Sequence, residues 1–530
     1  MRGGRERVAW ARDLGLDAGA AVPGISRRSL LRGLGGLAGG GLVTALTGCS
    51  SPAQVRHAGQ GAGRPVALPA QGSTGRGQSP TYRSAPRLRP PLVVVDVRRP
   101  GTAPGVVLTD CHGGTGQQGP MIIGDDGDLV WFEPLSDHGT PSLRAFNLRV
   151  QRYRGHPVLC WFEGAVVDGH GRGHYVLADA GYRQVAMVEA ANGLQGDLHE
   201  LFLTDRGTAV FTAYGTASAD LSAAGGASDG TYFYGEVQEV DVATGRLVFS
   251  WRSDHHVGFD ESYAPAPRDG RTPWDYFHIN SINVDPSDGN LIVSARNCSA
   301  FYKVDHSGGG LMWRLGGKRS DFAMGPGTGF AYQHDVTPHA GGTFTIFDNE
   351  GSPWVSPPSR GLVLLVDEDR RRATLRRQYH HFPPVESAAL GSVQDLPDGH
   401  VFIGWGTSTY FTEYDASGQV VYDGRLGGAG LLSYRAFRQP WEGRPRDAPA
   451  VAVERSAKAA LVYVSWNGAT QVSGWRVLGG RSAATLASLG TAPRVGFETR
   501  IAVPSAPSRL AVDALDASGR VLGRSAVHRA

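Results

Sequence analysis

The feature that most constrains the fold of this chain is a weak internal repeat between about residues 82 and 445. Each unit joins two apolar strands through a turn built from Asp, Asn or Gly. The clearest units are DLHELFLTDRGTAVFTAYG (197–215), HINSINVDPSDGNLIVSAR (278–296), HDVTPHAGGTFTIFDN (334–349) and SVQDLPDGHVFIGWG (392–406). Repeated hairpin signals of this kind predict an all-β protein.

A second type of hairpin alternates with the first. It has an aspartate before a tight turn and an apolar run after it, as in QEVDVATGRLVFSW (238–251), YKVDHSGGGLMWRL (302–315) and TEYDASGQVVYDGR (412–425). One hairpin of each type makes a four-stranded unit, and the chain holds roughly six such units. We therefore predict a six-bladed β-propeller over residues 82–448, with a series of β-sandwiches as the alternative.

The pattern changes after about residue 449. The segment AALVYVSWNGATQVSGWRVLGG (459–480) alternates apolar and polar residues, and two further strands follow it in residues 500–525. This pattern predicts a small fibronectin-III-like β-sandwich over residues 449–530.

The N-terminus carries an export signature. Residues 26–31 read SRRSLL, and a Gly- and Leu-rich run follows that ends in the lipobox-like tetrapeptide LTGC at Cys49. We predict a Tat-type lipoprotein signal peptide over residues 1–49, lipidation of Cys49, and a chain tethered to the outer face of the cell membrane. The alternatives are a soluble exported protein and a cytosolic protein with a chance arginine pair. Residues 50–81 are rich in Gly, Ser, Pro and Gln and predict a disordered linker.

Charge and cysteine content exclude several classes of function. The net charge is only +3, and no basic stripe interleaved with aromatic residues is present, so we expect no nucleic-acid partner. The cysteines show no CxxC spacing that would indicate a zinc site. Beyond Cys49, the three cysteines Cys111, Cys160 and Cys298 allow one disulfide, although the sequence does not choose the pair.

Polar residues stand near the start of each repeat, where the first strand of a propeller blade lines the central channel. Gln151, His199, His278, His334 and Gln394 are expected to converge there from different blades. With Asn280, Arg296 and Arg360, the histidines would form a cationic pocket suited to an anionic ester. His199, His278, His334 and Asp335 are the alternative of a metal site, but no local histidine motif supports it, so we predict neither a metal nor a cofactor.

Several motifs resemble the arylsulfotransferase family, in its actinobacterial lipoprotein-like branch. They are DYFHINSINVD, SARNCSAFYKVD, WRLGGKRSDF, FAYQHDV, FTIFDNEGS and GHVFIGWG, and the resemblance extends from about Tyr82 to about Pro445. It implies a six-bladed propeller that moves a sulfuryl group from a phenolic sulfate ester to a phenol. This chemistry requires no nucleotide donor and no metal.

The resemblance also implies a two-step reaction through a sulfated histidine. It makes His278, His334 and Arg360 the catalytic candidates. The substrate-binding candidates are Asn280, Arg296, His199, Gln394 and Tyr410.

Two positions depart from the family pattern. Thr409 and Tyr410 stand where the nucleophilic histidine is expected, and Ser352 stands where an arginine is expected. The nucleophile is then His334 or His278, or it is absent. If it is absent, the chain is a non-catalytic ligand-binding propeller of the cell surface, or its chemistry has changed to that of a different hydrolase or a quinone-dependent dehydrogenase. The sequence leaves open whether the chain forms a homodimer.

Overall fold

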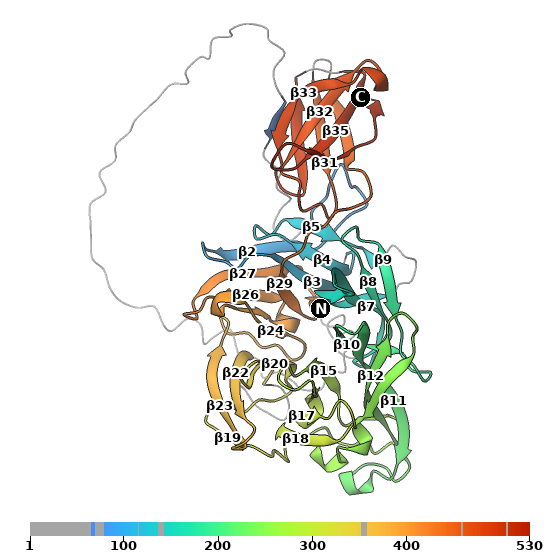
Figure 1. Cartoon of the computed structure of the whole chain (residues 1–530), viewed down its shortest axis with the longest axis vertical. Coiled ribbons are helices and arrows are strands. Elements are labelled where there is room, and N and C mark those ends of the chain that lie inside the picture. Colours follow the sequence, from blue (N-terminus) through green and yellow to red (C-terminus); the bar gives the residue numbers. More distant parts are fainter. Residues whose placement is uncertain are drawn as a thin grey trace, which may run out of the picture.

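The computed structural model describes residues 65–68, 79–114, 116–135, 143–350, 358–456, 459–504 and 507–529. The predicted signal peptide, Cys49 and Ser352 lie outside the described residues. In the described part, the chain is all-β, with strands joined by turns and short 3₁₀ segments (Figure 1). No helix in it is long and apolar enough to span a bilayer.

The larger part of the molecule consists of mostly antiparallel sheets that follow one another along the chain. The first contains β3 (Val106–Gly113), β4 (Gly119–Ile123) and β5 (Leu129–Phe132), joined by β28 (Leu431–Leu432) and β29 (Ala436–Gln439). The next strands are β6 (Arg144–Tyr153), β7 (His156–Val167), β8 (His170–Ala178) and β9 (Gln184–Val188). They connect through one bridging pair, Gly196 and Gly173, to β10 (Gly196–Leu203), β11 (Thr208–Ala219), β12 (Gly230–Asp241) and β13 (Leu247–Arg252), with β14 (Trp274–Asp275) beside β12.

Three further sheets complete this part. One contains β15 (Ile279–Val284), β16 (Leu291–Ala295), β17 (Ala300–Val304) and β18 (Leu311–Gly316). Another contains β20 (His334–His339), β21 (Thr343–Asp348), β22 (Arg360–Asp367), β23 (Arg372–Tyr379) and the short β19 (Ala323–Met324). The last contains β24 (Ser392–Asp395), β25 (Val401–Gly404), β26 (Tyr410–Tyr414), β27 (Val420–Gly427) and β2 (Leu92–Arg98).

The innermost strands of these sheets contact one another in sequence order. β3 contacts β6, then β10, β15, β20 and β24 follow in turn, and β24 contacts β29, which pairs with β3. Two strands close this circuit from opposite ends of the chain, since β2 adds to the sheet of β27 and β29 adds to the sheet of β3. The arrangement is a β-propeller-like all-β fold, as the repeat predicts (Figure 1).

Side-chain amides fasten neighbouring inner strands to each other. Gln151 bonds the backbone of Leu201 and Leu203 at 2.8 Å, and Gln394 bonds both backbone groups of Arg438 at 2.8 and 2.9 Å. Inner strands of separate sheets leave their edge groups unpaired, and each carboxamide supplies one donor and one acceptor. These two glutamines therefore hold strands together, where the repeat had predicted that they face the channel.

Apolar cores lie between adjacent sheets. Phe301 and Trp313 from one sheet meet Phe344 and Leu362 from the next, and all four are buried. A sheet covered on both faces needs apolar residues at consecutive positions, which explains continuous runs such as LIVSA in β16.

The three described cysteines do not form the disulfide that the sequence allows. Cys111, Cys160 and Cys298 are all free and buried. They belong to three separate apolar cores, so their sulfur atoms cannot meet. Burial raises the pKa of Cys160 to about 11, which keeps this thiol protonated.

Two further sheets form the C-terminal part around one shared core (Figure 1). One contains β30 (Ala450–Arg455), β31 (Ala460–Ser465), β34 (Glu498–Val503) and β1 (Val66–Leu68). The other contains β32 (Gly474–Gly480), β33 (Ala487–Pro493), β35 (Arg509–Leu515), β36 (Val521–Arg524) and β37 (His528–Arg529). Strand β1 comes from the predicted linker, where the apolar triplet Val-Ala-Leu pairs with the edge of β34.

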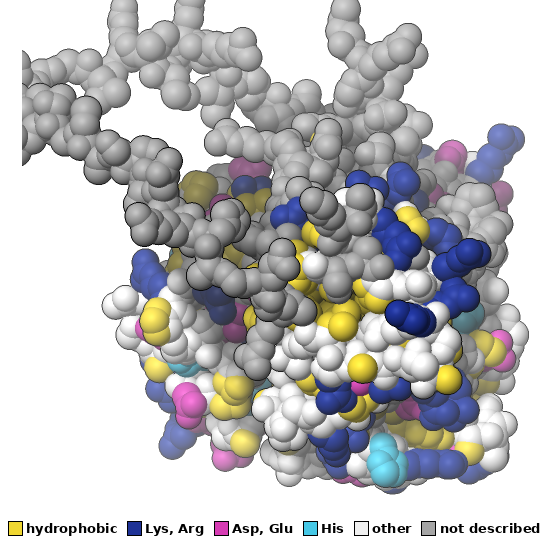
Figure 2. Space-filling model, turned by 90° about the horizontal axis from the view of Figure 1, so that it is seen from above, with side chains coloured by type: hydrophobic (Ala, Val, Ile, Leu, Met, Phe, Trp, Pro, Cys, Tyr) yellow, Lys and Arg dark blue, Asp and Glu magenta, His cyan; other side chains and the backbone are white. Residues whose placement is uncertain are grey.

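On the face seen in Figure 2, Lys and Arg side chains are dispersed among apolar and neutral ones.

Candidate functional site

Three histidines from different sheets lie buried near the inner strands. His199 is in β10, His278 directly precedes β15, and His334 opens β20, and each is at most 2% exposed. The structure brings His199 and His278 into contact, with ring centroids 4.9 Å apart. His334 opens β20, which contacts β15 directly after His278, and the three histidines are called here the histidine layer.

Two of these histidines are held by aspartates. His199 Nδ1 lies 2.6 Å from Asp197 Oδ2, and His278 Nδ1 lies 2.5 Å from Asp275 Oδ2. Burial acts to raise the pKa of both carboxyls, but the neighbouring histidines hold each pKa below its usual value. A carboxylate only accepts, so each Nδ1 carries the proton and donates it. Each Nε2 then keeps its lone pair, and neither makes a hydrogen bond to a described residue.

His334 is held differently. Its Nδ1 donates to Asn349 Oδ1 at 2.7 Å, and its Nε2 accepts from the Leu390 N–H at 3.3 Å. Burial lowers the pKa of His334 well below its usual value, so the ring is neutral. Both of its nitrogens are engaged, which makes it a poorer candidate for the nucleophile than His199 or His278.

Arg296 supplies the positive charge beside the histidine layer. It is 5% exposed, its guanidinium lies 4.9 Å from the ring centre of Tyr332, and its Nε donates to Asn297. Burial, together with this charge, lowers the pKa of His278 to about 3, although Asp275 opposes the shift. An arginine in this position can bind the oxygens of an anionic ester.

β-Bulges place these side chains. The pairing of the inner strand with its neighbour shifts within β6, β10, β15 and β20 at Phe146/Arg149, Gly196/Leu201, Ile279/Ser281 and His334/Thr337. At or beside these positions, Asn147, His278 and Asp335 have φ between 52° and 63°. Bulges redirect side chains that a regular strand would alternate between its faces.

A second buried group lies next to the histidines along the chain. Arg435 Nη1 is 2.9 Å from Glu200 Oε2 and 3.3 Å from Asp335 Oδ1, and Arg149 also pairs with Glu200. Arg149, Glu200, Asp335 and Arg435 form what we call the charge cluster. Burial acts to raise the pKa of Glu200, but the two arginines hold it below its usual value.

Three predicted site residues lie outside the histidine layer. Arg360 pairs with Asp348 at 3.0 Å and Glu350 at 3.0 Å, so its charge is neutralised within its own sheet. Gln394 is occupied by the Arg438 backbone. The ring centroid of Tyr410 lies 4.3 Å from that of His381, with the two planes tilted by 48°, and His381 Nε2 lies 3.3 Å from Asp423 Oδ1. These contacts engage all three side chains away from the histidine layer.

Asn280 lies nearer to the site. Its Nδ2 donates to the Gln333 carbonyl at 2.6 Å, while its buried Oδ1 has no hydrogen bond. The Asn280 carbonyl accepts from Arg435 of the charge cluster.

The sequence reasoning missed the partners of the histidines. Asp197, Asp275 and Asn349 orient the three rings, and Arg435 anchors the cluster beside them. A signal existed for the aspartates, because Asp stands two residues before His199 and three before His278. No local signal marks Asn349, which reaches His334 from the end of the neighbouring strand.

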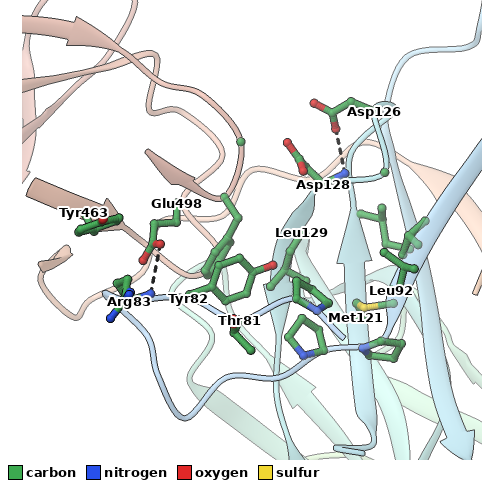
Figure 3. A pocket seen from close by; sticks show the side chains of 18 of the residues that line it. Thr81, Tyr82, Arg83, Leu92, Met121, Asp126, Asp128, Leu129, Tyr463 and Glu498 are labelled. Atoms are coloured by element: carbon green, nitrogen blue, oxygen red, sulfur yellow. Dashed lines mark hydrogen bonds between the residues drawn. The ribbon is translucent and has the colours of Figure 1, made fainter. Parts of the chain in front are cut away.

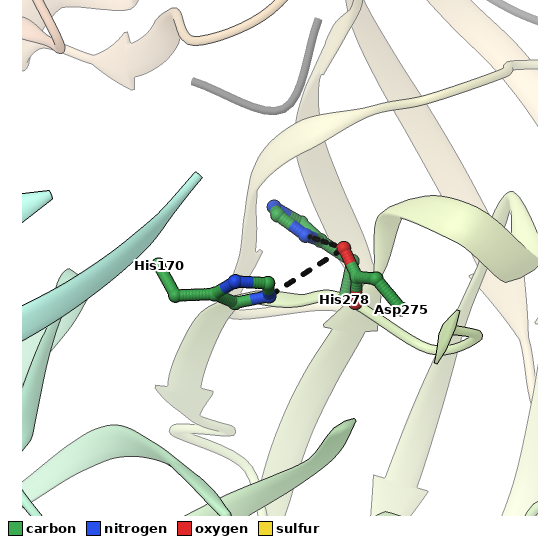
Figure 4. A group of neighbouring side chains, drawn as sticks. All are labelled: His170, Asp275 and His278. Atoms are coloured by element: carbon green, nitrogen blue, oxygen red, sulfur yellow. Dashed lines mark hydrogen bonds and ion pairs between the residues drawn. The ribbon is translucent and has the colours of Figure 1, made fainter. Parts of the chain in front are cut away.

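The predicted alternative metal set also changes. Among the described residues, the group that could hold a metal ion is His170, Asp275 and His278, whose ligand atoms all lie within 4.8 Å of one another (Figure 4). His199 and His334 do not belong to it.

A cavity of about 540 Å³ lies elsewhere, between the segment 80–93, the β4–β5 turn and the C-terminal sheets (Figure 3). Glu498 accepts hydrogen bonds there from Arg83 and Ser84, and Asp126 accepts one from the Asp128 N–H. Burial raises the pKa of Asp128, and Asp126 adds to the rise. The residues that line this cavity include no histidine and no cysteine.

A family model described as Arylsulfotransferase (ASST) matches residues 149–427. No curated protein matches the chain.

Solved structures show only distant likeness. A Bacteroides caccae protein of unknown function is 12% identical, with 63% of this chain and 98% of that chain covered and a TM-score of 0.39. A virginiamycin B lyase from Staphylococcus aureus is 10% identical, with 68% and 95% covered and a TM-score of 0.30. A periplasmic gluconolactonase from Pseudomonas aeruginosa is 12% identical, with 62% and 99% covered and a TM-score of 0.34. Likeness at this level carries no inference about activity.

Proposed function

The chain belongs to the arylsulfotransferase family, whose model covers residues 149–427, and from this premise we propose that it transfers a sulfuryl group from a phenolic sulfate ester to a phenol. The observation that carries the proposal is the pair of aspartate-held histidines. His199 and His278 each present an Nε2 lone pair, their rings are 4.9 Å apart, and Arg296 lies beside His278. A nucleophile, a base and a cation are the groups that this reaction needs.

In the first step, His278 Nε2 attacks the sulfur atom. The N–S bond forms as the S–O bond to the aryl oxygen breaks, and the donor leaves as phenolate with the electron pair. Asp275, bonded to Nδ1–H at 2.5 Å, stabilises the positive charge that develops on the ring. Arg296 binds the peripheral sulfuryl oxygens, where charge resides in a loose transition state.

In the second step, the acceptor phenol attacks the sulfur of the sulfated histidine. His199 Nε2 takes the phenolic proton, and Asp197 at 2.6 Å stabilises the imidazolium that results. The N–S bond breaks and its electron pair returns to His278 Nε2. The proton then passes from His199 to solvent, which restores both histidines.

The test uses the full chain with 4-nitrophenyl sulfate, with and without a second phenol. We expect nitrophenolate release that rises with added phenol and falls by about 10³-fold or more in His278→Ala. Mass spectrometry of an acid-sensitive, base-stable adduct on the peptide holding His278 identifies the nucleophile. His381→Ala is the matched control. This histidine also pairs with an aspartate, but its ring lies beside Tyr410, outside the histidine layer.

Two results would overturn the proposal. If the intact fold, checked by circular dichroism, releases no nitrophenolate at any pH, the non-catalytic ligand-binding protein becomes the better account. If His334→Ala abolishes the adduct while His278→Ala retains it, the nucleophile is His334 and the aspartate argument fails.

We further propose that the ring of inner strands is a six-bladed propeller and that the C-terminal sheets form a fibronectin-III-like sandwich. The circuit of inner-strand contacts and its closure by β2 and β29 support the first. The two sheets around one core support the second. An experimental structure tests both.

We also propose export and lipid anchoring through Cys49, supported by the SRRSLL and LTGC motifs of the sequence. Incorporation of a labelled fatty acid in the producing cell, lost in Cys49→Ala, is the expected result. Unchanged labelling in that variant would place the anchor elsewhere.

A further inference from the structure

A second grouping of polar side chains lies around Asp275 and shares His278 with the histidine layer. His170 opens β8, Asp275 ends β14 of the same extended sheet, and His278 precedes β15 of the next sheet (Figure 4). His170 Nε2 lies 3.5 Å from Asp275 Oδ2, the same oxygen that contacts His278 Nδ1, and the two histidine rings have centroids 5.4 Å apart. His170 is 4% exposed and takes no part in the proposed transfer reaction.

The hydrogen bonding of this grouping is incomplete. Both ring nitrogens of His170 and Oδ1 of Asp275 are buried without a hydrogen bond to a described residue. The rings of Tyr214 and Phe233, 4.3 and 4.4 Å from the His170 ring, fix that ring but offer it no polar partner. Buried polar atoms are nearly always satisfied, so three unsatisfied atoms around one carboxylate indicate a missing partner.

We propose that His170, Asp275 and His278 bind one divalent transition-metal ion of the zinc type. Two imidazoles and one carboxylate suit zinc and its neighbours, whereas Mg²⁺ and Ca²⁺ prefer sites made of oxygen ligands. In tetrahedral zinc sites, ligand atoms lie about 3.4 Å apart, since each bond is about 2.0–2.1 Å long. The His170–Asp275 separation of 3.5 Å matches this spacing.

The His278–Asp275 contact must open to admit the ion. Its 2.5 Å separation is that of a hydrogen bond, so the metal would replace the Nδ1 proton as the link between the two side chains. Asp275 has an unpartnered Oδ1 with which to adjust. Arg296, with Nη2 4.0 Å from Asp275, is the nearest cation and opposes the ion's charge.

Metal binding would change what His278 can do, a consequence that rests on the proposed function, although the site itself does not. In the transfer reaction, Nδ1 carries the proton and Nε2 holds the lone pair. A metal ion bound to Nδ1 needs a lone pair on Nδ1. The proton of the neutral ring must then move to Nε2. His278 then becomes a hydrogen-bond donor and cannot attack sulfur.

The first experiment measures binding without any sulfate ester. The full chain, freed of metal by a chelator, is titrated with Zn²⁺ in a calorimeter and with Co²⁺ in a spectrophotometer. We expect one ion per chain, visible absorption typical of tetrahedral Co²⁺, and no heat with Mg²⁺. In His170→Ala, the Zn²⁺ affinity should fall at least tenfold.

The control is His112→Ala, because His112 is also buried, also lacks a hydrogen bond, and lies 3.2 Å from an aspartate outside this grouping. Zn²⁺ affinity should be unchanged in it. The proposal is overturned if folded wild-type chain takes up no Zn²⁺, or if His170→Ala and Asp275→Asn, both folded by circular dichroism, bind Zn²⁺ as wild type does.

The second experiment separates this inference from the proposed function. Zn²⁺ should inhibit nitrophenolate release by the wild-type chain, and this inhibition should be lost in His170→Ala. If Zn²⁺ binds with the expected variant pattern but leaves release unchanged, the metal site stands and His278 is not the nucleophile. If no release is ever seen, the binding data still decide the metal site.

Discussion

The histidine layer and the charge cluster are adjacent along the same strands, but they differ in how completely their polar atoms are paired. Glu200 follows His199, and Asp335 follows His334. In the charge cluster, each carboxylate contacts an arginine, with Arg435 2.9 Å from Glu200 and 3.3 Å from Asp335. In the histidine layer, only the Nδ1 side of His199 and His278 is bonded, and Nε2 is left without a partner.

This difference separates a structural role from a chemical one. Buried charges are tolerated when they are paired, and pairing removes them from any reaction. A nucleophile or base needs one oriented but unoccupied lone pair, which an aspartate on the opposite ring nitrogen provides.

The largest effect is expected from Asp275→Asn. An amide can donate to Nδ1 and so favours the wrong tautomer of His278, which should lower kcat by about 10³–10⁴-fold. Circular dichroism and steady-state kinetics check fold and rate together. Asp423→Asn, which alters the partner of His381, serves as the control and should keep the wild-type rate within a few-fold. Equal rates in Asp275→Asn and wild type would mean that Asp275 does not orient a catalytic ring.

Arg435→Met should destabilise the fold by about 3–5 kcal/mol, since Glu200 and Asp335 remain buried without their cation. Urea unfolding measures this loss. Arg206→Met is the matched control, because that arginine pairs with Glu239 but its side chain is 66% exposed, so less than about 1 kcal/mol should be lost. Similar losses in both variants would show that the charge cluster contributes no more to the free energy of unfolding than an exposed ion pair does.

Arg296→Ala should lower kcat/KM by about 10²-fold, because it removes the cation beside the histidine layer. Arg360→Ala is the comparison, since this arginine is neutralised by Asp348 and Glu350 and should change kcat/KM by less than about threefold. Kinetics with 4-nitrophenyl sulfate measure both. The reverse ranking would return Arg360 to the catalytic role that the sequence predicts.

The smallest effect concerns pH. Burial holds the pKa of His334 below its ordinary 6.5, so the unfolded chain binds this proton more readily than the folded chain does. Stability is therefore unaffected above pH 6.5 and falls as pH drops below it, by up to about 1.4 kcal/mol per pH unit.

Glu200 behaves in a separate window. Arg149 and Arg435 hold its pKa below the ordinary 4.5, so its contribution to stability is present above pH 4.5 and is lost at lower pH. Urea unfolding from pH 7 to pH 3.5 measures how the free energy of unfolding depends on pH. His334→Gln should weaken this dependence below pH 6.5, and Glu200→Gln should weaken it below pH 4.5. A single shared window would mean that the two groups titrate as one unit.

Local patterns were sufficient for the fold class and for part of the site. Period-two apolar runs and Asp- or Gly-containing turns depend on neighbouring residues, so they predicted the sheets and the C-terminal strands. The position of each histidine at the start of a repeat indicated which rings lie near the inner strands. The family motifs added the reaction.

The all-β architecture, the family and the histidines can be read from the residues, because they depend on residue type and spacing within a strand or a turn. The contacts of those histidines depend on the folded chain. Bulges in β6, β10, β15 and β20 set where side chains point, and long-range contacts brought Asn349 to His334 and His170 to Asp275. Such contacts join residues that are far apart in the sequence, so no local pattern specifies them. Local patterns therefore could not show that Arg360 and Gln394 are engaged by partners outside the histidine layer. Nor could they show that two histidines keep a free lone pair.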